Sequence, residues 1–153
     1  MSPTPSPAQR RRLAAAARRA ARSAYAPYSK FPVGAAVLTG SGKIFAGCNV
    51  ENASYGLCNC AERTAIFSAV AAGEREVRAV AVYTPTPHPT LPCGACRQVI
   101  NEFGPEAVVL CLCDTEGTEE ETLPGLLPGA FGPADLLTAP ARTDKRRQRP
   151  AVR

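Results

Sequence analysis

The stretch VRAVAVYTPTPHPTLPCGACRQVINEFGPEAVVLCLC, residues 77–113, decides the expected fold. It begins with a strand-like run rich in valine and ends with a second apolar, strand-like run. Between the two runs lie a loop with four prolines in nine residues and a helix-like segment over about Cys93–Phe103, followed by the break Gly104-Pro105. A helical crossover between two strands predicts parallel pairs in a sheet that is covered by helices on both faces.

The segments before this stretch predict a helix and a hairpin. Ser6-Pro7-Ala8-Gln9 has the pattern of a capping box, and the Ala/Arg-rich run that follows predicts a helix to about Ala24. FPVGAAVLT, residues 31–39, and KIFAGCNV, residues 43–50, predict paired strands around a Gly-rich turn. Gly34 marks a position of close packing.

A second helix and an edge strand complete the expected fold. Asn59 is the expected cap of a helix from Cys60 to about Ala72, and Gly73 is the expected stop. After a turn over residues 114–117, TEEETL predicts an edge strand. We therefore expect an α/β fold: a single-domain three-layer α/β/α sandwich around a mixed, roughly five-stranded sheet.

Length and charge limit the classes of protein that are possible. The 153 residues suit one domain, which we expect over residues 6–138, between a disordered N-terminus over 1–5 and a basic, disordered tail over 139–153. The segment 142–153 has six basic residues and one acidic residue, so it carries the whole net charge of +5. Such a tail favours a solvated chain end over a nucleic-acid-binding arm. No apolar run approaches the ~20 residues of a membrane helix, and no secretory signal is visible, so we expect a cytoplasmic protein.

The cysteines point to free thiols. There are seven of them, an odd number in a chain of ordinary globular size, which is unlike a disulfide scaffold. Cys111 and Cys113, two apart in VVLCLC, are typical of small buried apolar residues. The remaining thiols are available for metal.

Three of these thiols form a pattern suited to zinc. Cys93 and Cys96 are a C-x-x-C pair at a loop-to-helix junction, which alone fits a zinc site or a redox dithiol equally well. Cys60, at a second helix start, would supply a third thiolate, and three protein ligands with one open position are typical of catalytic zinc. Glu62 could then present its carboxylate beside the open position as an acid/base. Alternatively, Glu62 and Asn59 form a plain capping box, an interpretation that the downstream Pro-Cys-x-x-Cys disfavours.

Two other residues compete for the role of ligand. His88 is the only histidine, but it lies in the four-proline loop and is interpreted as an ordinary loop residue. Cys58 is the stronger competitor, since it is two residues before Cys60. We prefer Cys60 because only it has the two-residue spacing to Glu62.

A His or Cys, one spacer, Glu and a later Pro-Cys-x-x-Cys constitute a zinc-deaminase signature. Beyond that signature, the chain resembles the cytidine deaminases, specifically the small homotetrameric three-cysteine kind. The resemblance covers about Tyr25 to Leu136 and rests on four motifs in order: AYAPYSKFPVGAAVLTGSGKIFAGCNVENASYG, NCAERTAIFSAVAAGE, PCGACRQVINEF and LLPGAF. The chain differs from the family at Leu91, where members often have serine, and in the unusually Pro-rich loop that precedes Leu91.

The resemblance implies a site built around one Zn²⁺. It implies zinc ligation by Cys60, Cys93 and Cys96, with Glu62 as the proton shuttle. It further implies a set of substrate-binding residues: the ribose pair Asn49 and Glu51 with the main chain of Val50 between them, Phe31 near the base and sugar, and Phe131 contributed by a neighbouring subunit. Phe31 and Phe131 could instead be plain core residues.

Charge balance adds one more residue. Zinc at +2 with three thiolates leaves a net charge of −1, which opposes ionisation of a bound water. Arg63 matches a family arginine that hydrogen-bonds zinc-ligating sulfurs, and we hypothesise that it offsets this charge. For Arg97 we expect a structural or surface role.

The implied activity is the zinc-dependent hydrolytic deamination of cytidine and deoxycytidine in pyrimidine salvage, in which a zinc-bound hydroxide attacks C4 and Glu62 carries the proton. The implied partners are a small nucleoside and further copies of the chain in a homotetramer. One alternative is also an enzyme, a deaminase of polynucleotides or of a nucleoside antibiotic. A second alternative, from a different class, is a zinc-stabilised structural or partner-binding module, in which Glu62 would have no assigned role.

Overall fold

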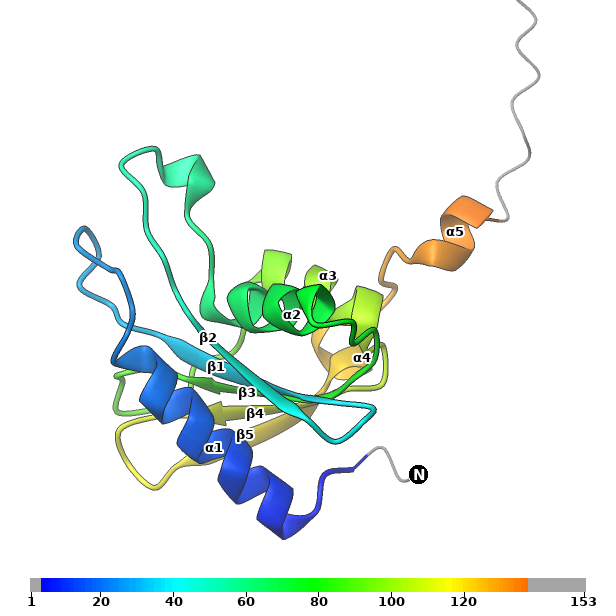
Figure 1. Ribbon diagram of the computed structural model, residues 1–153, viewed down its shortest axis with the longest axis horizontal. Helices are drawn as coiled ribbons and strands as arrows, with labels where there is room; N and C mark the ends of the chain where they lie inside the picture. The colour runs from blue at the N-terminus through cyan, green and yellow to red at the C-terminus, as the bar shows by residue number, and fades with distance from the viewer. Residues whose placement is uncertain (1–3, 138–153) are drawn as a thin grey trace, which may run out of the picture.

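A five-stranded sheet forms the centre of the protein, seen here in a computed structural model that describes residues 4–137. The strand order is β2-β1-β3-β4-β5 (Figure 1). In chain order the strands are β1 Gly34–Thr39, β2 Ile44–Cys48, β3 Val77–Tyr83, β4 Val108–Leu112 and β5 Thr118–Thr122. These bounds confirm the five predicted strands, with some ends shorter than expected.

The sheet is mixed because only one neighbouring pair is parallel. β3 and β4 run parallel, joined by α3 (Gly94–Phe103), whereas all other neighbours are antiparallel. The helix α2 (Ala61–Ala71) also connects two strands of the same direction, β2 and β3, but β1 lies between them. β1, the hairpin partner of β2, therefore separates β2 from β3, and these two strands do not form a second parallel pair.

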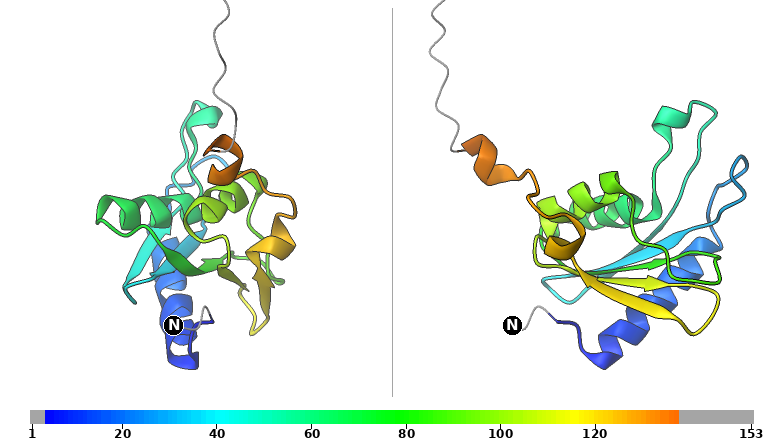
Figure 2. Two further views of the ribbon diagram at one scale, coloured as in Figure 1. Left: turned by 90° about the vertical axis from the view of Figure 1, so that its right-hand side faces the viewer. Right: turned by 180° about the vertical axis from the view of Figure 1, so that it is seen from behind.

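Helices cover both faces of the sheet, as predicted. α1 (Pro7–Ala21) packs on one face, while α2 and α3 lie side by side on the other (Figures 1 and 2). Alternate residues of β1 separate the two layers: Ala36 and Leu38 pack with α1, and Ala35 and Val37 pack beneath α2 and α3. This alternation is the period-two pattern of a strand buried on both faces.

Two glycines let helices approach the sheet closely. A Cβ on Gly34 would clash with the backbone of Ala17 in α1. A Cβ on Gly47 would clash with the backbone of α2 at Ala61 and Ala65. The expected role of Gly34 is thus confirmed, and Gly47 has the same role on the opposite face.

The N-terminal helix begins as expected and ends earlier. Ser6 and Gln9 form the predicted capping box, but α1 ends at Ala21 rather than near Ala24. Of the stretch 1–5 that was expected to be disordered, Pro5 is buried and its carbonyl accepts from Arg10 Nε at 3.1 Å. Pro5 therefore contacts α1, while disorder over residues 1–5 stays a prediction. The predicted boundary at 138 and the basic tail over 139–153 lie outside the described residues.

The start of α2 differs from the prediction by one residue. Cys60, not Asn59, is the N-cap residue. The Asn59 backbone N–H donates to the Val50 carbonyl at 2.9 Å, and its side chain donates to Thr64 Oγ1 at 3.0 Å. The alternative capping box between Asn59 and Glu62 therefore does not form.

Three short elements were not expected from the sequence. They are a 3₁₀ turn over Tyr55–Leu57 and the helices α4 (Leu123–Leu126) and α5 (Pro133–Leu137). None of the helices within residues 4–137 has the length and apolar character that a membrane crossing requires.

Candidate metal centre

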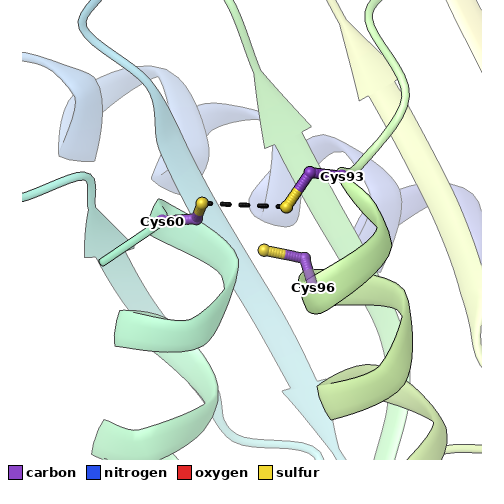
Figure 3. A group of neighbouring side chains, drawn as sticks. All are labelled: Cys60, Cys93 and Cys96. Carbon is purple, nitrogen blue, oxygen red and sulfur yellow. Dashed lines mark hydrogen bonds between the residues drawn. The ribbon is translucent and has the colours of Figure 1, made fainter. Parts of the chain in front are cut away.

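Two helix N-termini meet above the sheet and bring three thiols together. Cys60 is the N-cap residue of α2, Cys93 is the N-cap residue of α3, and Cys96 lies in the first turn of α3. Figure 3 shows the three sulfurs pointing toward one another across the gap between the helices. Both helix dipoles favour negative charge at this point, so the positions suit thiolates.

The spacing of the sulfurs fits zinc. The Cys60 and Cys93 Sγ atoms are 3.9 Å apart, and all three Sγ atoms lie within 4.8 Å of one another. Tetrahedral zinc with Zn–S bonds of about 2.3 Å requires sulfurs about 3.8 Å apart. Among the described residues, no fourth His, Cys, Asp or Glu joins this group. The donor set is thus compatible with three protein ligands and one open position.

The pKa values of two of these thiols, Cys60 and Cys96, are shifted in opposite directions. Hydrogen bonds from the Cys96 thiol and from Arg63 lower the pKa of Cys60 to about 5. The hydrogen bond of Cys96 to Cys60, together with burial, raises the pKa of Cys96. One thiolate therefore opposes the ionisation of the next, and a dication is the counter-charge that three thiolates at this distance require.

Arg63 supplies positive charge at the edge of this cluster. Its Nη2 donates to Cys60 Sγ at 3.4 Å. Its Nε is buried and has no hydrogen-bond partner among residues 4–137. The guanidinium lies within one turn of the cap residue because both belong to the start of α2.

Glu62 is the buried acid of the site. It is only 4 % exposed and follows Cys60 by two residues in the first turn of α2. Burial raises its pKa, and the charge of Cys60 raises it further. A carboxyl in this environment holds a proton more readily than a solvated one.

A cavity of about 260 Å³ opens beside the thiols. Its lining consists of Phe31, Val33, Asn49, Cys60, Ala61, Glu62, Val82, Thr84, Thr90, Leu91 and Cys93. It lies where β3 ends, the usual place for a site in an α/β fold. A larger cavity of about 500 Å³ lies where β3 begins, but no thiol lines it, so we place the site at the smaller one.

The expected ribose pair is divided between two cavities. Asn49 lines the cavity with the thiols, and its side chain holds the preceding loop by accepting from Val33 N at 2.8 Å and donating to the Phe31 carbonyl at 2.9 Å. Glu51 lines a neighbouring cavity of about 290 Å³ with Tyr28 and Tyr55. Its carboxylate accepts from the backbone N–H of Tyr28 at 2.9 Å, and hydrogen bonds, chiefly from Ser29, lower its pKa.

Val50 lies between these two residues and fixes the loop backbone. Its N–H donates to the Asn59 carbonyl at 2.9 Å, and the Asn59 N–H donates back at the same distance. The loop between α1 and β1 carries Tyr28, and the loop between β2 and α2 carries Tyr55. Both loops project from the same end of the molecule (Figures 1 and 2), and the centroids of the two tyrosine rings are 5.7 Å apart.

The two expected aromatic contacts are placed differently. Phe31 lines the cavity of its own chain and is partly exposed. Phe131 does not line that cavity; it is 57 % exposed, and its carbonyl accepts from Gln98 Nε2 at 2.7 Å on α3. Neither ring belongs to the buried core.

The competing ligands lie outside the cluster. Cys58 Sγ accepts from Asn52 N at 3.3 Å, and His88 offers its carbonyl to Thr86. Arg97 is structural, as expected, because its guanidinium donates to the Pro92 and Leu126 carbonyls at 2.8 Å. Cys111 and Cys113 are fully buried, also as expected.

Sequence reasoning missed part of the cavity wall. Val82 at the end of β3, and Thr84 and Thr90 in the four-proline loop, were not proposed as site residues. The position of Thr90 and Leu91 directly before Pro-Cys-x-x-Cys was a usable signal, because residues next to a ligand tend to line its site.

Comparison with known protein families gives one clear match. Residues 7–112 match the description "Cytidine and deoxycytidylate deaminase zinc-binding region". A cytidine deaminase of Sporosarcina psychrophila is 52 % identical over 129 residues, which are 84 % of this chain and 95 % of that protein. A cytidine deaminase of Mycobacterium tuberculosis is 41 % identical over 120 residues, 78 % of this chain and 87 % of that protein.

Solved structures agree with the sequence relatives. A crystal structure of cytidine deaminase from Burkholderia pseudomallei has a TM-score of 0.76 and 54 % identity, covering 79 % of this chain and 98 % of the other. A crystal structure of cytidine deaminase from Mycobacterium tuberculosis has a TM-score of 0.69 and 41 % identity, covering 80 % and 96 %.

We expect the purified protein to contain about one zinc per chain, and the substitution Cys93→Ser to reduce that content to a small fraction, because two thiolates do not complete the donor set. Cys58→Ser is the matched control, since Cys58 lies two residues from a cluster member but outside the cluster. Elemental analysis after gel filtration measures both variants. Equal zinc in the two would contradict the assignment.

Proposed function

The chain belongs to the cytidine and deoxycytidylate deaminase family, and from this premise we propose that it hydrolyses cytidine and deoxycytidine to uridine and deoxyuridine, releasing ammonia. The observation that carries the proposal is the cluster of three thiols beside a buried glutamate, at a cavity that Cys60, Cys93 and Glu62 line. A binding module would need the thiols but would have no use for a carboxyl buried beside them.

Zinc fits the donor set of Cys60, Cys93 and Cys96. When bound there, it supplies the Lewis acidity that makes water nucleophilic near neutral pH. The convergence of two helix N-termini favours the thiolate forms that such a ligand set requires.

Glu62 acts as the proton carrier. We assign it two protons in turn: the first leaves the attacking water and goes to the ring nitrogen next to C4, and the second leaves the hydroxyl group added at C4 and goes to the departing amine. Its raised pKa supports this role, because a carrier works best when its pKa lies near the operating pH. Its burial keeps bulk water from competing for the proton.

The loops at the open end of the site hold the sugar. We assign the ribose hydroxyls to Asn49 and Glu51, with the main chain of Val50 between them, and the base and sugar edge to Phe31. Carboxylate and amide oxygens keep spare lone pairs after bonding the loop backbone, so they can still accept from hydroxyls. A diol held in this way favours a free nucleoside over a polymer, whose 3′ oxygen is esterified.

We further assign the reaction to pyrimidine salvage in the cytoplasm. The seven cysteines are all free thiols in the structure, which suits a reducing compartment. A thiol titration of the denatured, metal-free protein that found fewer than seven thiols would argue against that compartment.

We expect Glu62→Gln to lower kcat for cytidine and deoxycytidine by about a thousandfold or more while zinc content is kept, because general acid–base catalysis is lost. Glu116→Gln, at an exposed position, is the control and should match the native rate. Ultraviolet absorbance follows the reaction, with a cytosine-containing single-stranded oligonucleotide as a third substrate. Native protein that is inactive on both nucleosides, or as active on the oligonucleotide, would refute the proposal.

We expect Arg63→Ala to retain zinc but to lower kcat by about tenfold, because the charge of the thiolates is then less well offset. Arg22→Ala, which removes an exposed arginine at the end of α1, is the matched control. Zinc content and kcat are measured on the same preparations. An unchanged rate in the Arg63 variant would defeat this role.

We also propose a homotetramer in which Phe131 completes the site of a neighbouring subunit. Its exposed ring, together with the exposed Tyr55, Leu57 and Phe67, leaves apolar surface that assembly would cover. We expect a mass by light scattering of about four times the 16.1 kDa chain. We also expect that mixing subunits of Phe131→Ala with subunits of Glu62→Gln restores activity beyond that of either variant. A monomer, or the absence of restoration after subunit exchange, would exclude the shared site.

A further inference from the structure

The four-proline loop, residues 84–92, forms one wall of the cavity beside the thiols. It leaves β3 at Thr84 and returns to α3 at Cys93, so both of its ends lie at the site. Thr84 and Thr90 line the cavity from these two ends, and Thr84 is only 3 % exposed. A selective role for this wall rests on the proposed function, because it concerns how the cavity distinguishes the substrate of that reaction from its product.

Three threonine hydroxyls of this loop are joined by hydrogen bonds. Thr86 Oγ1 lies 2.7 Å from the His88 carbonyl, 2.7 Å from Thr84 Oγ1 and 3.4 Å from Thr90 Oγ1. Thr86 is therefore the centre of the network. A hydroxyl has one proton to donate and two lone pairs that can accept.

The His88 carbonyl fixes which hydroxyl is the donor in each hydrogen bond of this network. A carbonyl oxygen can only accept, so Thr86 donates its single proton to His88. Thr84 must then be the donor in its bond with Thr86, and Thr90 likewise. The proton of Thr84 is thus directed into the loop, which leaves the lone pairs of this hydroxyl available to accept.

The rest of the loop keeps Thr86 in this position. Its carbonyl accepts from Asp114 N at 2.9 Å, and the Pro87 carbonyl accepts from Thr115 Oγ1 at 3.3 Å. Thr84 is fixed as well, because its N–H donates to the Leu112 carbonyl at 3.1 Å. The prolines reduce the remaining backbone freedom, so the network does not need to form anew when a ligand enters.

The position of the reacting atom, C4, determines which group of a bound nucleoside lies at this wall of the cavity. C4 of the base must lie against Glu62 and the thiols, and its exocyclic substituent is one bond away. In cytosine that substituent is an amine, which donates, whereas in uracil it is a carbonyl oxygen, which only accepts. An acceptor at this wall would stabilise the first and repel the second.

We propose that Thr84 accepts a hydrogen bond from the 4-amino group of the nucleoside, and that Thr86 is the positioning residue that prevents Thr84 from donating. The wall is thereby selective for the amino substrate over the carbonyl product. Thr84 determines affinity for cytidine, and Thr86 determines the weak binding of uridine.

The two residues can be separated by their effects on substrate and product. Thr84→Val removes the acceptor, so we expect KM for cytidine to rise about tenfold, whereas uridine, which the acceptor repels, should inhibit at least as strongly as it inhibits the native protein. Thr86→Val releases the Thr84 proton, so we expect uridine to inhibit about tenfold more strongly with little change in KM. Thr84→Ser and Thr86→Ser keep the hydroxyls and should restore native values.

Steady-state kinetics with uridine as competitive inhibitor measures all four variants, with zinc content and melting temperature determined on each preparation. A general loosening of the loop would weaken cytidine and uridine together in both valine variants, and that result would overturn the proposal. So would a KM unchanged in Thr84→Val. An absence of deamination by the native protein would instead refute the proposed function, whereas failure of this inference leaves native turnover intact.

Discussion

The site depends on the convergence of two helix N-termini on one face of the sheet. α2 and α3 begin at the same end because α2 follows β2 and α3 follows β3, and these two strands run in the same direction. Their cap residues, Cys60 and Cys93, therefore meet, and the dipoles of both helices act on the same small volume. The thiol of Cys111, by contrast, lies in the core, where burial raises its pKa to about 12 and keeps it protonated.

The two charged side chains next to the thiols, Arg63 and Glu62, have different electrostatic environments. Arg63 and Glu62 are adjacent in sequence, but one turn of helix directs the arginine to a sulfur and the glutamate into a buried position on the cavity. Positive charge thus lies beside the thiols, while a carboxyl of raised pKa lines the cavity. The other walls of the cavity come from loops with backbone hydrogen bonds of their own, so the main chain sets the shape of the cavity together with the side chains.

Most of the fold and the cluster of three thiols could be predicted from sequence, since the elements that carry them follow from local patterns. The valine-rich strands, the capping box at Ser6 and the C-x-x-C pair all act over a few residues. The features that could not be predicted depend on tertiary contacts. Asn59 looked like a cap, but its N–H pairs with Val50 across the loop, which moves the cap to Cys60. The division of Asn49 and Glu51 between two cavities follows from loop packing, and the direction of the Thr86 hydrogen bonds requires the position of a carbonyl.

The absence of a side chain at Gly47 has a consequence for the geometry of the three-thiol cluster. The backbone of α2 lies directly on β2 at Gly47, so the position of β2 sets the position of Cys60 at the start of α2. Cys93 and Cys96 are positioned instead by α3. A side chain at residue 47 would clash with this backbone, so α2 could no longer lie as close to β2. A residue outside the three-thiol cluster thus helps to set the spacing of its sulfurs.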